Sequence, residues 1–160
     1  FIATAHSEGG RQVAGTQALE MPSEFAKGYY IRPTVFADVR PDHQLFQEEV
    51  FGPVISITRF ETDDQAIALA NTGDFGLGVS IWSRDIARAH RLSRHIRGGI
   101  IWLNDHHRND PRSVWGGVKD SGFGKENGWD ALRGYLSKKS VVIRTEPGYD
   151  DWFAGSNRYG

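Results

Sequence analysis

The chain has 160 residues, a formal net charge of −1 at pH 7 and no cysteine. The missing thiols exclude disulfides and a cysteine nucleophile within this chain, and the near-neutral charge gives no field that attracts nucleic acid. Since no apolar run approaches the ~18 residues of a membrane span, we expect a cytoplasmic protein that binds neither nucleic acid nor a membrane. Glycine is frequent, at 19 residues, which indicates tight turns or a backbone that closely approaches another group.

The first elements are short. Residues 1–7 are typical of the end of a helix, which a following pair of glycines terminates. A helix end without its beginning leads us to expect further sequence upstream of Phe1. Residues 11–16 are a strand candidate, and residues 29–35 are rich in β-formers but contain a proline that favours an edge or a bend.

Strands and helices alternate in the centre of the chain. Thr62 and Gln65 form a capping box at the start of one predicted helix, and Ser83 or Asp85 caps the next. The strands are predicted at residues 54–60, 79–82 and 100–103, and the intervening helices at residues 62–71 and 84–97. Two such crossover units predict a parallel three-stranded core with helices on its faces, and a continuous apolar last strand is expected to be buried on both faces.

The rest of the chain is predicted to be a polar loop over residues 105–121, a helix over 125–136 and a last strand over 140–144. The predicted fold class is therefore α/β, with a mostly parallel sheet and flanking helices. In such sheets, sites lie beyond the carboxyl ends of the strands, which here lead into Thr62, Ser83 and the loop from Asp105.

Several patterns that suggest chemistry do not have the spacing it needs. The glycine-rich stretch 116–128 matches neither the P-loop nor the dinucleotide fingerprint, so a tightly turned loop is favoured over phosphate binding. His106 and His107 are adjacent, so their side chains point apart, and no cysteine or i,i+4 histidine pair supports them, which favours pocket lining over a metal site. The arginines of residues 84–97 are typical of a solvated helix face.

A more suggestive segment runs from Glu48 to Pro53, directly before a predicted strand. A carboxylate at such an entry can accept the hydroxyls of a ribose, and the neighbouring Phe51 ring can cover an apolar cofactor face. From composition alone, the alternative is a glutamate at a helix end with the phenylalanine in the core, and that alternative is favoured.

Five motifs in one order, however, give the chain a family resemblance. The motifs are Pro33-Thr34-Val35-Phe36, Glu48-Glu49-Val50-Phe51-Gly52-Pro53-Val54, Ala70-Asn71 with Phe75-Gly76-Leu77, Trp102-Leu103-Asn104, and Gly116-Gly117-Val118-Lys119-Asp120-Ser121-Gly122-Phe123-Gly124-Lys125-Glu126. Together, across about residues 1–144, they resemble the C-terminal third of the NAD(P)-dependent aldehyde dehydrogenase superfamily.

The resemblance implies roles for several side chains. Glu49 is expected to bind the nicotinamide ribose of NAD or NADP, and Phe51 to pack beside the nicotinamide. The loop that borders the aldehyde pocket contributes four residues, Asp105, His106, His107 and Trp115. The resemblance also implies two parts, residues 1–138 from the catalytic domain and residues 139–160 as an oligomerisation strand and tail, with a second copy or a missing N-terminal portion as partner.

The departures from the family pattern limit what this chain does alone. The nucleophilic cysteine and the general-base glutamate of such enzymes lie upstream of every motif present, so we expect no catalytic residue and no activity in the isolated chain. Lys125 stands where the family usually has arginine, a mild change. Two alternatives remain: a non-catalytic module that self-associates or complements another chain, and a hydrolase in which Glu49 contacts His106 or His107.

Overall fold

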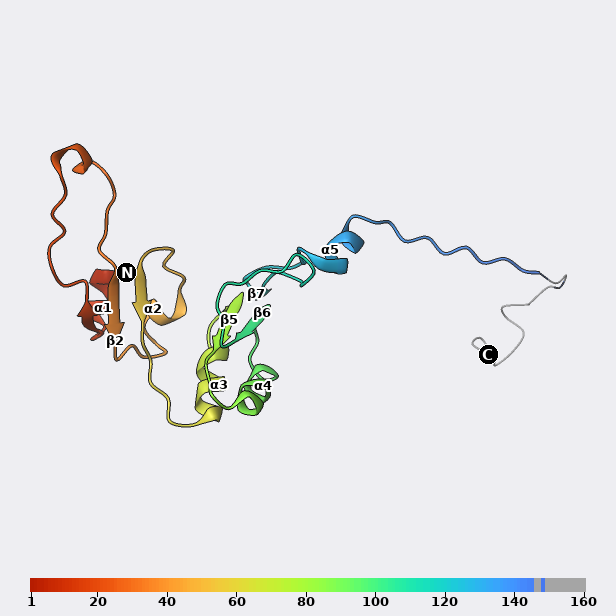
Figure 1. Ribbon diagram of the computed structural model, residues 1–160, viewed down its shortest axis with the longest axis horizontal. Coiled ribbons are helices and arrows are strands. Elements are labelled where there is room, and N and C mark those ends of the chain that lie inside the picture. Colours follow the sequence, from red (N-terminus) through yellow and green to blue (C-terminus); the bar gives the residue numbers. More distant parts are fainter. Residues whose placement is uncertain (146–147, 149–160) are drawn as a thin grey trace.

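The computed structural model describes residues 1–145 and 148, and two packed units follow one another along the molecule (Figure 1). The first unit comprises six elements: α1 (Ile2–Ser7), β1 (Arg11–Ala14), η1 (Ser23–Phe25), β2 (Thr34–Ala37), α2 (Gln44–Gln47) and β3 (Val54–Ser56). The second comprises seven: α3 (Asp63–Asn71), β4 (Phe75–Gly76), β5 (Gly78–Ile81), α4 (Ile86–Ser93), β6 (Ile100–Leu103), β7 (Val118–Lys119) and α5 (Gly128–Gly134). In the described part of the chain, no helix has the length and apolar character that a bilayer crossing requires.

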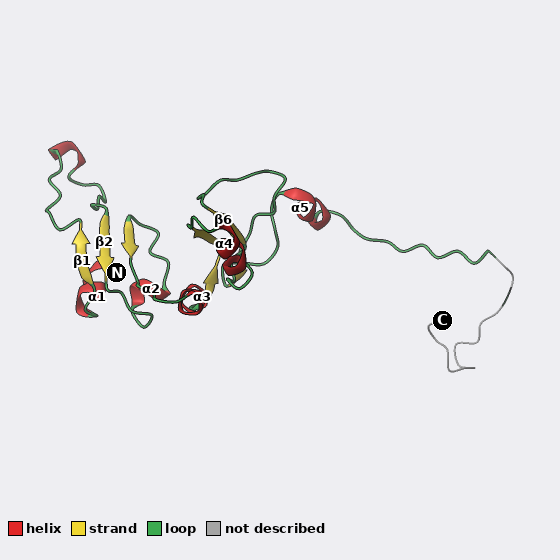
Figure 2. Cartoon of the chain, turned by 60° about the horizontal axis from the view of Figure 1, so that its bottom comes forward, coloured by secondary structure: helices red, strands yellow, loops and turns green. Residues whose placement is uncertain are grey.

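The first unit is a small mixed sheet covered by helices. β2 lies between β1, which is antiparallel to it, and β3, which is parallel; α1 and α2 pack next to each other beside the sheet (Figure 2). Its buried core consists of Ala5, Phe36, Val39 and Leu45. The long connection between β1 and β2 projects away from this core and carries η1 at its tip (Figure 1).

The turn after α1 shows why the sequence needs glycine there. Gly9 has φ of +90°, and the Gly10 N–H donates to the Ala5 carbonyl at 2.8 Å. A Cβ at Gly10 would lie 2.9 Å from that carbonyl oxygen and 3.3 Å from the Phe36 ring. The glycine pair thus ends the helix, as predicted, and lets α1 reach the core.

In the second unit, β5 and β6 are parallel and joined by α4, with Ser80 opposite Trp102. Ile81, Ala89 and Leu92 form its core. Both predicted helix starts are confirmed: Thr62 Oγ1 accepts a hydrogen bond from the Gln65 N–H at 3.2 Å, and Asp85 accepts one from the Arg88 N–H at 2.9 Å. The Gln65 side chain bonds the N–H of Glu61, one residue before the cap.

The predicted three-stranded parallel core is wrong. β3 pairs with β2 and β5 pairs with β6, so the crossover through α4 joins two parallel neighbours as predicted, whereas the crossover through α3 joins strands of two different sheets. A strand–helix–strand connection favours parallel strands, but successive strands are sheet neighbours only about two-thirds of the time. The described chain is therefore a mixed α/β structure with small sheets, and Trp102 alone is buried in β6.

The predicted strand over residues 140–144 is also absent from the described structure. The backbone after α5 is extended but in neither helix nor strand, and Val141, Val142 and Ile143 are largely exposed, Val142 at 94%. A strand requires a neighbouring backbone to satisfy its polar groups, and no described segment supplies one. No oligomerisation strand is evident; residues 146–147 and 149–160 of the predicted tail lie outside the described residues.

Two helices are shorter than predicted. α4 ends at Ser93 rather than at residue 97, and α5 covers Gly128–Gly134 rather than residues 125–136. Asn127, the residue directly before α5, has φ of +61°, which lies outside the right-handed helical region, so the helix cannot begin earlier in the chain.

Candidate functional site

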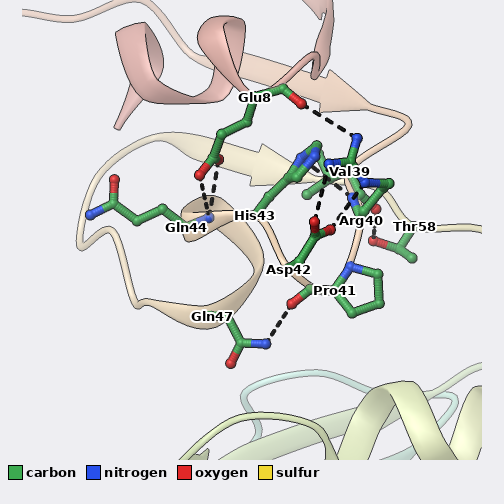
Figure 3. A network of polar contacts seen from close by, with 9 residues as sticks. All are labelled: Glu8, Val39, Arg40, Pro41, Asp42, His43, Gln44, Gln47 and Thr58. Carbon is green, nitrogen blue, oxygen red and sulfur yellow. Dashed lines mark hydrogen bonds and ion pairs between the residues drawn. The ribbon is translucent and has the colours of Figure 1, made fainter.

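The predicted cofactor carboxylates follow α2, whose start is fixed by long-range polar contacts. The Gln44 N–H donates to both carboxylate oxygens of Glu8, at 3.1 and 3.2 Å, and the Gln47 amide donates to the Pro41 carbonyl (Figure 3). These bonds secure both ends of this single-turn helix. The segment that begins at Glu48 therefore starts from a fixed point at the end of α2 and leads to β3 of the same unit.

The two adjacent glutamates differ in their surroundings. Glu48 accepts a hydrogen bond from the Gln44 amide at 3.1 Å, whereas Glu49 is exposed and accepts none from the described residues. An ionised carboxylate with all its lone pairs free can accept two hydroxyls at once. Of the pair, Glu49 is the one with its oxygens available to a ligand.

Phe51 is held in an unusual conformation. Its backbone φ is +48°, in the left-handed region that bulky residues rarely adopt, and its ring is 96% exposed. The turn is fixed on the following side, where the Val54 N–H donates to the Gly52 carbonyl and the Thr34 N–H to the Pro53 carbonyl, both at 2.8 Å. The alternative that placed Phe51 in the core is wrong for the described structure, and backbone strain of this kind often occurs where a ligand is held.

A hollow of about 220 Å³ lies beside these carboxylates. Its opposite wall comes from the end of α3 and the turn that follows it. The lining residues are Phe46, Gln47, Glu48, Glu49, Leu69, Ala70, Thr72, Gly73, Asp74 and Phe75.

The predicted aldehyde-side residues gather around one buried ring on the second unit. Trp102 is 8% exposed, and its indole N–H donates to the Arg108 carbonyl at 2.8 Å. The ring centroids of His106, Trp115 and His107 lie 5.7, 6.0 and 6.3 Å from it. We call Trp102, His106, His107 and Trp115 the aromatic cluster.

Local contacts orient the members of this cluster. His106 Nδ1 lies 2.8 Å from Ser80 Oγ on the neighbouring strand, and the His106 N–H donates to the Asp105 carboxylate at 2.8 Å. Trp115 is held by an antiparallel bridge to Glu126. Three of the four predicted pocket residues, His106, His107 and Trp115, thus lie around Trp102. The fourth, Asp105, contacts only the backbone N–H of His106 among them.

The charged side chains of the loop compensate one another. Asp110 accepts hydrogen bonds from the Arg112 guanidinium, which hold the pKa of that carboxyl below its ordinary value of 3.8. Arg108 faces Asp105 at 3.9 Å. Because each arginine has a carboxylate beside it, the loop presents little net charge to the aromatic cluster.

Other sequence hypotheses find no support in the geometry. No hydrogen bond joins Glu49 to His106 or His107, although all three are described, so the hydrolase has no catalytic pair. The described residues contain no group of three or more His, Cys, Asp or Glu side chains placed to hold a metal. The Lys125 ammonium in the glycine-rich loop bonds the carbonyls of Gly116 and Gly117, which favours the structural interpretation of that loop.

Sequence reasoning missed Ser80 and the central position of Trp102. Register could have found them, since Ser80 and Trp102 are opposite each other in two strands that were both predicted. It also missed the contacts of Lys119 described below, for which the sequence gives no signal.

Comparison with known proteins decides the family. The model of the aldehyde dehydrogenase family matches residues 1–141. The chain belongs to the aldehyde dehydrogenase family. The resemblance inferred from the five motifs is thereby confirmed at the level of the family.

Among curated relatives, betaine aldehyde dehydrogenase of Cereibacter sphaeroides is 43% identical over 147 residues, covering 92% of this chain and 29% of that protein. Peroxisomal aminoaldehyde dehydrogenase 1 of Pisum sativum is 40% identical over 152 residues, covering 95% and 30%. The chain thus spans less than a third of the length of these aldehyde dehydrogenases.

Solved structures give the same result. Betaine aldehyde dehydrogenase from Staphylococcus aureus in complex with NAD+ matches with a TM-score of 0.86 and 34% identity, over 96% of this chain and 30% of that one. The Mycobacterium tuberculosis aldehyde dehydrogenase complexed with NAD+ matches with a TM-score of 0.82 and 38% identity, over 92% and 30%.

Proposed function

We propose that this chain supplies the C-terminal part of the catalytic domain of an NAD+-dependent aldehyde dehydrogenase that oxidises an aldehyde to a carboxylic acid. The observation that carries the proposal is the free Glu49 carboxylate beside the exposed, strained Phe51. Glu49 holds the nicotinamide ribose, and Phe51 covers an apolar face of the nicotinamide. NAD+ supplies the hydride acceptor, while the nucleophile and general base come from the remainder of the enzyme.

The aromatic cluster favours an aldehyde that carries an ammonium group. Indole faces attract cations, with about 0.5–2 kcal/mol per contact, and the neighbouring Arg108 and Arg112 are neutralised by carboxylates. Relatives named betaine aldehyde and aminoaldehyde dehydrogenases point to the same substrate class. Trp115 is the ring we assign to contact that group, because it is the more exposed of the two indoles, Trp102 being buried.

Adjacent glutamates allow a matched test in the intact enzyme that carries this chain. Glu49→Gln keeps the shape but weakens hydrogen bonds to the ribose, each worth about 1.5–3 kcal/mol when charge-assisted, so NAD+ affinity falls roughly 10- to 100-fold. Glu48→Gln is the control and leaves the affinity within about twofold. NAD+ binding is measured by fluorescence titration; equal effects of the two substitutions contradict the assignment.

A second candidate function is supported by residues 141–143, whose apolar side chains are largely exposed and whose backbone makes no hydrogen bond to the described residues. Such a segment suits a module that self-associates or complements another chain. Light scattering of the isolated chain tests the second function, because a clean monomer contradicts a self-associating module, and an NAD+-dependent turnover assay tests both functions. We expect no turnover from the chain alone, because it has no cysteine; turnover by the pure chain contradicts both candidates.

A further inference from the structure

Lys119 makes contacts that neither the cofactor site nor the aromatic cluster explains. Its backbone has φ of +54° at the entrance to the glycine-rich loop. Its part-buried ammonium donates to the carbonyls of Asn71 at 2.7 Å and Gly73 at 2.9 Å. The last carbonyls of a helix have no partner within the helix and carry its negative dipole end. Lys119 therefore caps the C-terminal end of α3 from the end of β7, 48 residues away in sequence.

Further bonds join the same two segments. The Asp120 N–H donates to the Asp74 carbonyl at 2.8 Å, and the Gly76 N–H donates to Ser121 Oγ at 2.9 Å. β4 and β7 pair antiparallel between these contacts. The turn after α3 and the start of the glycine-rich loop are thus one connected piece, with Lys119 as its charged link.

This connected piece forms part of the proposed cofactor site. The turn at residues 72–75 is the wall of the hollow that faces Glu48 and Glu49. This turn lies close to the segment that carries the two glutamates, because a Cβ on Gly73 would lie 3.1 Å from Gln47 Oε1. The glycine-rich loop also lines a second hollow of about 400 Å³, together with Trp115 of the aromatic cluster.

We propose that Lys119 is a positioning residue that holds the turn at residues 72–75 against the segment that carries Glu49. It thereby sets the position of the Glu49 carboxylate relative to the loop that carries the aromatic cluster. The inference rests on the proposed role of Glu49. Removing the ammonium leaves the carbonyls of Asn71 and Gly73 without this donor and frees the turn after α3 to move. The wall then withdraws from Gln47, and the Glu49 segment loses its fixed position.

The test uses the intact enzyme that carries this chain, with NAD+ affinity measured by fluorescence titration and kinetics measured separately. Lys119→Met is expected to weaken NAD+ binding roughly 3- to 30-fold, the range for residues that act through others, with aldehyde KM within about twofold at saturating NAD+. Lys119→Arg, which can still donate to both carbonyls, restores most of the affinity. Lys138→Met, at an exposed lysine, is the control and changes nothing.

A double-mutant cycle distinguishes positioning through Glu49 from a general structural role. In the Glu49→Gln background, Lys119→Met is expected to add less than about twofold, because coupled residues are not additive. Multiplicative losses, or a folded Lys119→Met variant with unchanged NAD+ affinity, overturn the proposal. If Glu49→Gln itself leaves the affinity unchanged, the proposed function fails first.

Should Lys119→Met not fold, Lys119→Gln takes its place, since it removes the ammonium with a smaller change in side-chain polarity. It is expected to weaken NAD+ binding in the same direction by at least about twofold. Unchanged NAD+ affinity in that variant overturns the proposal as well.

Discussion

The two units of the chain are stabilised in different ways. The first has the deeper core, with Phe36 at 0% exposure, and it also buries two polar side chains, Thr34 and His43. The second has a smaller core around Ala89, no buried polar side chain among the described residues, and charged groups that join its helices at the surface.

The two units differ most in the hydrogen bonds and ion pairs that their polar side chains make. In the first unit, Thr34 Oγ1 donates to the Arg32 carbonyl at 2.8 Å, and His43 Nδ1 accepts from the Arg40 N–H at 3.4 Å. In the second unit, Asp63 at the start of α3 binds both Arg88 and Arg91 of α4. Both units have an apolar core and exposed ion pairs, such as Arg11–Asp38 in the first. The difference is that the unit that positions Glu49 buries polar side chains, whereas the described residues of the unit that carries the aromatic cluster do not.

The largest predicted effect tests the first core. Phe36→Ala is expected to lower the free energy of unfolding by about 3–5 kcal/mol, because it removes a fully buried ring and leaves a cavity. Urea denaturation gives the total, and amide exchange is expected to show lost protection in α1 and β2 but not in α4. Phe123→Ala, at a fully exposed ring, is the matched control. Equal loss of protection in α4 would mean that the two units unfold as one.

A smaller effect is expected from a helix cap of the second unit. Asp85→Ala removes the acceptor for the Arg88 N–H and should cost about 0.5–2 kcal/mol, with faster exchange confined to the first turn of α4. Asp120→Ala provides the comparison, because that carboxylate makes no hydrogen bond to the described residues. If the Asp85→Ala variant also shows faster amide exchange in β2, the two units are not independent.

The smallest effect concerns pH. Hydrogen bonds from Arg88, and then from Arg91, lower the pKa of Asp63 below its ordinary value of 3.8. The stabilisation by this lowered pKa is complete above the unfolded pKa and is lost as pH falls through the lower folded value. In acid titration of Asp63→Asn against the parent chain, the stability difference should shrink below about pH 4. A difference that persists unchanged at pH 2 would exclude this source.

Local features were predictable because each depends on a few neighbouring residues. The caps at Thr62 and Asp85 and the glycine turn after α1 follow from side-chain oxygens and backbone freedom within one turn of helix. The grouping of strands was not predictable, because a crossover specifies direction but not adjacency. The strand at residues 140–144 failed for a related reason: its β-forming residues have no backbone partner in the described chain.

The candidate site was predictable as residue types and not as an arrangement. The family resemblance singled out Glu49 and Phe51, but the sequence did not indicate that Gln44 binds Glu48 and leaves the Glu49 carboxylate without a partner among the described residues. The aromatic cluster depends on the register between β5 and β6, and the Lys119 cap depends on a turn with positive φ. Neither register nor such a turn is specified by composition or local periodicity.

The left-handed backbone of Phe51 bears on how such an enzyme responds to engineering. A non-glycine residue in that conformation costs roughly 1–2 kcal/mol, which slightly exceeds the ~0.5–1 kcal/mol that a flexible glycine adds to the entropy cost of folding. Phe51→Gly therefore relaxes the turn while it removes the ring. In a library selected for thermostability alone, glycine should be enriched at position 51, because it removes the backbone strain. In a library selected for turnover, glycine should be depleted there, because the ring is lost.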